Sequence, residues 1–133
     1  MGAGQTVNRP VLLDTSFLVQ LERETASGEI GPARKFLPKL RGRRLVVSIV
    51  NIEEILEGAI NERAAAADLH RFAVQGLHLA HARRCALLQR RSERRLGEND
   101  AWLVATADLL DADVVAADRA AFERLGPRYL PFR

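Results

Sequence analysis

The chain has 133 residues, the length of a single domain. Hydrophobic residues make up 47% of the chain, which excludes a disordered protein. The longest stretch without Asp, Glu, Lys or Arg (72–82) has only 11 residues, too few to cross a membrane. The net charge of +3 is too small to identify a nucleic-acid-binding protein, and the single cysteine, Cys85, excludes an internal disulfide and a cysteine-based zinc site.

The beginning of the chain predicts a short flexible leader, residues 1–9, ahead of one domain at 10–133. The leader shows no basic segment followed by an apolar one, the pattern of a secretion signal. Together with the lone cysteine, this predicts a protein of the reducing cytoplasm.

Charged residues are unevenly distributed. The stretches 34–44 and 83–95 each contain six Lys or Arg, whereas 98–118 contains six Asp or Glu and no base. Basic stretches beside an acidic one suit a protein that holds a polyanion near a bound divalent metal. Charged helix faces that meet water produce the same pattern, so both interpretations stay open.

The first half of the chain alternates between strand and helix patterns. The apolar run 11–13 predicts a buried strand, which passes through Asp14 into a helix over 17–22. A second helix is predicted over 33–40, after a proline, and the β-branched run 45–49 predicts the next strand. The following helix is predicted from apolar residues at helical spacing: Ile52, Ile55, Leu56, Ala59 and Ile60.

The second half continues this alternation. The helices predicted there cover residues 63–74, 81–96, 101–110 and 119–125. The strands predicted there cover residues 77–79, 114–116 and 129–130. Alternating strands and helices predict an α/β fold whose central sheet is mainly parallel and covered on both faces.

Acidic side chains follow the ends of the predicted strands. Asp14 follows the first strand and Asp118 follows 114–117, so the two carboxylates meet at one edge if these strands are neighbours in a parallel sheet. Asp100 begins the most apolar helix of the chain. Helix capping is the alternative interpretation of each aspartate. The helix after the second strand offers three candidate glutamates, among which periodicity does not choose: Glu53, Glu54 and Glu57.

Other site chemistries fit the sequence less well. No glycine-rich phosphate-binding loop follows the first strand, and no serine lies in a glycine-flanked nucleophile elbow. His78 and His81 lack a third metal ligand, and Cys85 is expected to be an inert thiol on a basic helix.

Four short segments occur in a characteristic order and spacing. They are VLLDTS at 11–16, SIVNIEEILEG at 48–58, NDAWLVATA at 99–107, and VVAADR at 114–119 followed by Phe122. In this register they resemble the PIN-domain ribonucleases, and among them the VapC-type toxins of bacterial toxin–antitoxin systems. One such segment alone is a weak match, but the four together span essentially residues 11–132.

The resemblance implies a PIN-like α/β/α sandwich and selects one of the three glutamates. The family places its glutamate six residues after the strand serine and four before a glycine, and this spacing selects Glu54. The catalytic residues that the resemblance implies are Asp14, Glu54, Asp100 and Asp118, with Thr15 and Ser16 as supporting hydroxyls. Two positions depart from the common pattern: Ala116, where many relatives have threonine, and Asn51, where a threonine or another small residue is common.

The implied chemistry is metal-dependent. Two unit charges about 4 Å apart cost on the order of 4 kcal/mol at an effective dielectric near 20, so clustered carboxylates require protons or a cation. Oxygen ligands without Cys or His favour Mg²⁺ or Mn²⁺ over zinc, with Asp14 and Asp100 as the main ligands. Water activated by the metal would then hydrolyse RNA, leaving 5′-phosphate and 3′-hydroxyl ends. The arginines expected to hold the RNA backbone are Arg43, Arg44, Arg83, Arg84, Arg90 and Arg91.

The resemblance also implies partners. They are an RNA substrate (tRNA, rRNA or mRNA), a VapB-type antitoxin that inhibits the enzyme, and a second copy of the chain in a homodimer or larger toxin–antitoxin assembly. Two alternative functions stay open. One is a catalytically silent PIN-like module that binds RNA or protein. The other is a metal-dependent phosphatase acting on small phosphoesters. One common phosphatase type begins with an Asp-x-Asp motif, and Ser16 stands here in place of its second aspartate.

Overall fold

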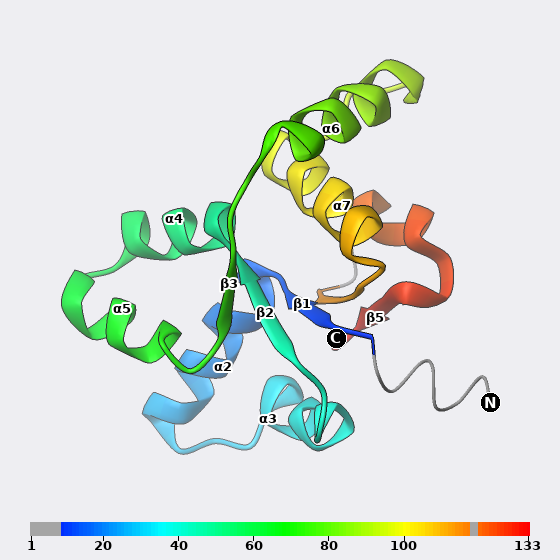
Figure 1. The fold of residues 1–133 in the computed structure, drawn as a ribbon. Coiled ribbons are helices and arrows are strands. Elements are labelled where there is room, and N and C mark those ends of the chain that lie inside the picture. The colour runs from blue at the N-terminus through cyan, green and yellow to red at the C-terminus, as the bar shows by residue number, and fades with distance from the viewer. Residues whose placement is uncertain (1–8, 118–119) are drawn as a thin grey trace.

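A five-stranded sheet forms the centre of the structure, and each strand runs parallel to its neighbours (Figure 1). The computed structural model describes residues 9–117 and 120–133. In the order β3-β2-β1-β4-β5, β1 takes the middle position. The strands are β1 (Val11–Leu13), β2 (Leu45–Ser48), β3 (Ala73–Gln75), β4 (Asp113–Ala116) and β5 (Tyr129–Pro131). The prediction of an α/β fold with a mainly parallel sheet is confirmed.

Helices connect the strands and cover both faces of the sheet (Figure 1). The α-helices are α2 (Thr15–Ser27), α3 (Pro32–Phe36), α4 (Ile49–Gly58), α5 (Glu62–Leu69), α6 (Leu79–Arg91) and α7 (Glu98–Leu110). Two 3₁₀ segments complete them: η1 (Leu37–Leu40) and η2 (Ala120–Arg128). Over the described residues, no helix combines the length and the apolar character needed to span a bilayer.

Side chains of the central strand alternate between two hydrophobic layers. Leu13 packs in one layer with Phe17 of α2, together with side chains of α3 and α5. Leu12 points to the opposite layer, where it packs with Leu103 of α7 and Phe122 of η2. Because successive side chains of a strand point to opposite faces, three buried residues in a row require cover on both sides. The α/β/α sandwich follows from this requirement.

The structure corrects several predicted boundaries in the middle of the chain. The helix expected over 63–74 ends at Leu69, and the strand lies at Ala73–Gln75 rather than at 77–79. This edge strand is short and half-exposed, and its position is set by pairing with β2, which the local pattern does not reveal. Ile60 belongs to the apolar residues from which this helix is predicted, but it lies beyond the end of α4 and is fully exposed.

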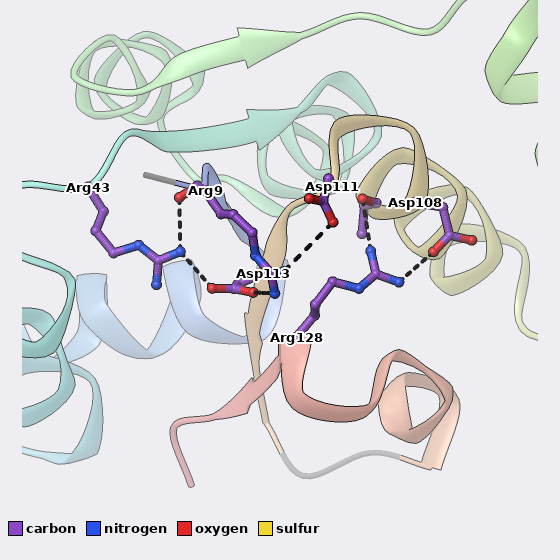
Figure 2. A network of polar contacts seen from close by, with 7 residues as sticks. Arg9, Arg43, Asp108, Asp111, Asp113 and Arg128 are labelled. Atoms are coloured by element: carbon purple, nitrogen blue, oxygen red, sulfur yellow. Dashed lines mark hydrogen bonds and ion pairs between the residues drawn. The ribbon is translucent and has the colours of Figure 1, made fainter. Parts of the chain in front are cut away.

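The amino edge of the sheet is held together by buried ion pairs (Figure 2). Asp113, at the start of β4, is only 2% exposed and accepts hydrogen bonds from Arg9 at 2.8 Å and Arg43 at 2.6 Å. Beside it, Asp108 of α7 joins Arg128 at 2.7 Å and Arg84 at 2.8 Å. The pairs of Asp113 join the beginnings of β1, β2 and β4. The pairs of Asp108 join α7 to α6 and to the residue before β5.

Asp113→Asn keeps the shape of the side chain and removes the charge between two arginines. We expect the free energy of unfolding to fall by about 3 kcal/mol, the lower end of the range for breaking a buried ion pair, because Arg9 is partly exposed. Urea denaturation at neutral pH measures this loss. Asp111→Asn is the matched control, because the Asp111 side chain is 74% exposed and lies 3.8 Å from Arg9. Equal losses in the two variants would contradict the prediction.

A buried histidine lies at the start of α6. The ring of His81 is 5% exposed, and its Nδ1 accepts a hydrogen bond from the backbone N–H of His78 at 3.1 Å. Its Nε2 is buried and has no hydrogen-bond partner among the described residues. Burial, and to a smaller extent the charge of His78, lower the pKa of His81. The fold therefore favours the neutral ring.

His81 makes the stability of the protein sensitive to acid. Because the pKa of His81 is lower in the folded than in the unfolded chain, the unfolded chain binds more protons just below the ordinary histidine pKa of about 6.5. Stability should fall as the pH drops below that value, by up to about 1.4 kcal/mol per pH unit. Chemical denaturation at several pH values should show a weaker fall for His81→Gln. The exposed His70→Gln control should retain the wild-type dependence, and an unchanged slope in His81→Gln would refute this role.

Candidate active site at the carboxyl edge of the sheet

Asp14 lies where the central strand ends. It is the N-cap of α2, and its Oδ2 accepts hydrogen bonds from the Ser16 backbone N–H at 3.1 Å and from the Ser16 hydroxyl at 2.6 Å. The Ser16 hydroxyl oxygen in turn accepts a hydrogen bond from the Ala117 N–H at 3.0 Å. Ser16 therefore joins the carboxyl end of β1 to that of β4. The capping interpretation of Asp14 is correct, and it places the carboxylate at this edge.

Glu54 reaches the same region from α4. This helix begins directly after β2, because the Ser48 side chain accepts a hydrogen bond from the Val50 N–H and caps it. The Glu54 Oε1 accepts hydrogen bonds from the Thr15 hydroxyl at 2.8 Å and from the Asn51 amide at 3.2 Å. The carboxylate is thus held by neutral donors on both α2 and α4.

Asn51 is the buried centre of this arrangement. Its side chain is 2% exposed, and its Nδ2 donates hydrogen bonds both to Glu54 and, at 2.9 Å, to the Thr15 hydroxyl oxygen. Its Oδ1 is buried without a hydrogen-bond partner in the described part of the chain. The departure from the family pattern at this position therefore supplies the donors that orient Thr15 and Glu54.

Asp100 comes from a third element, the first turn of α7. The positive end of the helix dipole favours a carboxylate there. Asp14, Glu54 and Asp100, with Thr15 and Ser16, line one cavity of about 490 Å³. The structure thus brings these residues, which are far apart in the sequence, to the same cavity.

The cavity has a donor set made of oxygen atoms. No histidine or cysteine is among its lining residues in the described chain, and carboxylates are the ligands that Mg²⁺ and Mn²⁺ prefer. Within residues 9–117 and 120–133, however, no three acidic, histidine or cysteine side chains stand close enough together to enclose an ion. The chemistry of the residues fits a magnesium-type ion, which in proteins usually keeps several of its waters.

The fourth predicted acid, Asp118, lies outside the described residues. The residue at the other departure from the family pattern, Ala116, is fully buried and packs in the hydrophobic layer with Leu12 and Phe122.

The arginines predicted to hold RNA lie away from this cavity. Arg43 is bound to Asp113 at the opposite edge of the sheet, and Arg84 is bound to Asp108. Four of the predicted residues are exposed: Arg44 near β2, and Arg83, Arg90 and Arg91 on α6. Among the described residues, the cavity is instead lined by Arg23 and Arg133, which the sequence analysis did not identify. Arg23 shares a face of α2 with Ser16 at helical spacing, which could have indicated it.

Comparisons with known proteins agree with this architecture. The sequence pattern that describes the PIN domain matches residues 11–126. A toxin–antitoxin complex from Klebsiella pneumoniae contains a similar chain, with 21% identity and a TM-score of 0.75 over 92% of this chain and 98% of that chain. The VapBC-1 structure from nontypeable Haemophilus influenzae is similar over 92% of this chain and 97% of that chain, with 21% identity and a TM-score of 0.70.

A third similar structure is VapBC2 from Rickettsia felis, which is bound to a DNA fragment from the VapBC2 promoter. It shares 16% identity at a TM-score of 0.70, over 91% of this chain and 96% of that chain. A search of curated protein sequences finds no significant match.

The arrangement around Asn51 predicts how the site responds to an added charge. Asn51→Asp places a buried carboxylate against the half-buried Glu54, where repulsion costs on the order of 4 kcal/mol at an effective dielectric near 20. We expect a comparable fall in the free energy of unfolding at neutral pH in EDTA. Repulsion raises the carboxyl pKa values in the folded variant, so the loss should shrink as the pH approaches about 4.

Urea denaturation of this variant at several pH values measures the effect. Asn61→Asp is the matched control, because Asn61 is an exposed N-cap where aspartate serves equally well. If Asn51→Asp is no less stable than this control at neutral pH, the hydrogen-bonding role of Asn51 is wrong.

Proposed function

Because the chain belongs to the PIN-domain family, whose members are typically metal-dependent nucleases, we propose that it is an endoribonuclease toxin of the VapC type. The observation that carries this proposal is the cavity at the carboxyl edge, where acids from α2, α4 and α7 converge. The proposed reaction is hydrolysis of RNA phosphodiester bonds in tRNA, rRNA or mRNA in the cytoplasm.

The proposed cofactor is Mg²⁺ or Mn²⁺, held mainly by Asp14 and Asp100. Such an ion supplies Lewis-acid activation of water and offsets negative charge on the phosphate. Asp14 is oriented for this role by its hydrogen bonds from Ser16, and the helix dipole of α7 favours an ionised Asp100. Asp118 is proposed as a fourth acid of the same site.

Glu54 is the proposed proton acceptor for the attacking water. The Thr15 hydroxyl and the Asn51 amide both donate hydrogen bonds to its Oε1. Their shared approach to one oxygen restricts the rotation of the carboxylate. Thr15 and Asn51 thus position Glu54, and Ser16 positions Asp14.

The exposed arginines on the surface are proposed to bind the RNA backbone farther from the reaction. Arg83 and Arg90 lie one above the other on the free face of α6, seven residues apart, and Arg91 and Arg44 are also exposed. Arg43 and Arg84 form ion pairs with Asp113 and Asp108.

A VapB-type antitoxin is proposed to bind the groove between α2, α4 and α5. Two cavities of about 440 and 370 Å³ meet there and share Glu22, Ile55, Ala65 and Asp68. The smaller cavity is also lined by the exposed Ile60 and by Glu54, so a chain bound in this groove would reach the catalytic cavity. The similar structures from K. pneumoniae and H. influenzae are toxin–antitoxin complexes. We further propose a homodimer as the unit that binds the antitoxin.

The nuclease proposal predicts which substitutions stop cleavage. Purified protein with Mg²⁺ or Mn²⁺ should cut a structured RNA, and EDTA should abolish the activity. Asp14→Asn, Asp100→Asn and Glu54→Gln should each reduce the rate on the order of a hundredfold or more, since the charge stabilisation supplied by a metal is worth several kcal/mol. Gel analysis of end-labelled RNA measures the rates and identifies the ends formed.

Glu53→Gln is the matched control for Glu54→Gln, because Glu53 is the neighbouring residue on α4 and is exposed. It should cut at the wild-type rate. Cleavage that survives EDTA or the Asp14 substitution would reveal a contaminating nuclease. A folded wild-type protein that binds RNA but cuts none would instead support the silent binding module.

A further inference from the structure

Two arginines from distant parts of the chain lie at the catalytic cavity. Arg23 is an exposed residue of α2, and Arg133 follows β5. Both line the same cavity as Asp14, Glu54 and Asp100. The cavity therefore combines carboxylates that would hold a cation with guanidinium groups that would bind an anion.

Arg133 is held in place by a chain of hydrogen bonds on α2. Its Nη1 donates to the Gln20 Oε1 at 2.8 Å, and the Gln20 Nε2 donates to the Glu24 Oε2 at 2.8 Å. Since the Gln20 amide nitrogen is bound to a carboxylate, its carbonyl oxygen is directed toward Arg133. The orientation of Gln20 is thus determined by Glu24.

Glu24 is itself held firmly by hydrogen bonds to the start of α3. The side chain is 2% exposed, and its oxygens accept hydrogen bonds from the backbone N–H groups of Gly31, Ala33 and Arg34 at 2.8–3.0 Å. Burial acts to raise the pKa of Glu24, but these bonds and the one from Gln20 outweigh it, so the pKa lies below its ordinary value. An ionised Glu24 therefore holds the start of α3 and, through Gln20, the position of Arg133.

The ring of Phe132 supports Arg133 from another direction. The guanidinium carbon lies 5.3 Å from the centre of this ring. Phe132 is buried, packs edge-to-face on Phe17 at 5.1 Å between ring centres, and donates its backbone N–H to the Ala116 carbonyl. Arg133 is thus held by Gln20 of α2 and by Phe132, which is itself hydrogen-bonded to β4.

Within the described part of the protein, the charges of Arg23 and Arg133 are not paired with an acid. Arg9, Arg43, Arg84, Arg95 and Arg128 each form an ion pair with an acid. Among residues 9–117 and 120–133, neither Arg23 nor Arg133 forms such a pair, and the partner of Arg133 is a neutral amide. A guanidinium has five N–H donors in a plane, and a phosphate oxygen pair matches this geometry.

We propose that Arg23 and Arg133 bind a backbone phosphate of the RNA next to the phosphate that is cut. This inference rests on the proposed nuclease function and identifies where the substrate backbone enters the cavity. An acidic cavity repels RNA, and two cations at its wall offset this repulsion where the strand must approach. The contact reads no base, so it serves RNA of any sequence.

We call Arg23 and Arg133 the phosphate clamp. Binding of a fluorescein-labelled oligouridylate tests this clamp separately from cleavage. Fluorescence anisotropy is measured in EDTA, where metal-dependent cutting cannot occur, over a series of salt concentrations. We expect Arg23→Gln and Arg133→Gln each to weaken binding on the order of tenfold, because hydrogen bonds to a charged group are lost. Each should also reduce the slope of log K against log salt, and the two substitutions combined should reduce it by about 0.7, the value for one phosphate contact on a single strand.

Two further variants sharpen the test. Arg133→Lys should restore the slope but not the full affinity, because lysine keeps the charge and loses the planar fork. Arg41→Gln is the matched control, since Arg41 is exposed next to the amino end of β2 and does not line the cavity. It should bind with the wild-type slope.

The outcomes separate this inference from the nuclease proposal. If Arg23→Gln and Arg133→Gln bind like Arg41→Gln, the clamp is wrong, whether or not the wild-type protein cuts RNA. If their slopes fall as expected while the wild-type protein cuts no RNA in Mn²⁺, the clamp is correct and the nuclease proposal fails. A wild-type protein that binds no oligouridylate at any salt concentration overturns the clamp, and cleavage of structured RNA then decides the nuclease proposal alone.

Discussion

The parallel pairing of β1 with β2 on one side and β4 on the other is the constraint on which the rest of the structure depends. All three strands end at one edge, so Asp14, the capped start of α4 and Ala117 are brought together there. Glu54 follows one and a half turns into α4, and its carboxylate meets Thr15 of α2 across the gap between the two helices. A one-residue shift in register would exchange the two faces of a strand and disperse these contacts.

The two edges of the sheet use charge in different ways. At the amino edge, arginines form ion pairs with the buried Asp113 and the half-buried Asp108, and these pairs attach strands and helices to one another (Figure 2). At the carboxyl edge, Asp14 and Glu54 accept hydrogen bonds from hydroxyl, amide and backbone groups. These hydrogen bonds fix the direction of both carboxylates at the cavity.

Density of arginine along the chain does not show which arginines form ion pairs within the fold and which line the cavity. The stretches 34–44 and 83–95 supplied every arginine that the sequence suggested, yet Arg43 and Arg84 are bound to acids far along the chain. Arg23 and Arg133 belong to neither stretch and reach the cavity only because α2 and the chain end after β5 lie on the same side of the sheet. Local sequence does not record which acid each arginine will meet.

By itself, the sequence determined the elements whose periodicity or capping is local: the strands at 11–13 and 114–116, the cap at Asp14, and the α/β alternation that requires a parallel sheet. The resemblance to the PIN-domain family selected Glu54 from its neighbours on α4, and the Glu54 side chain lines the cavity. Only the tertiary structure decided the position of the edge strand β3, the exposure of Ile60, the buried bonding of Asn51, and the side chains that complete the cavity. The physical reason is that periodicity acts within a few residues, whereas strand pairing, ion pairing and cavity lining depend on surfaces that meet only once the sheet has formed.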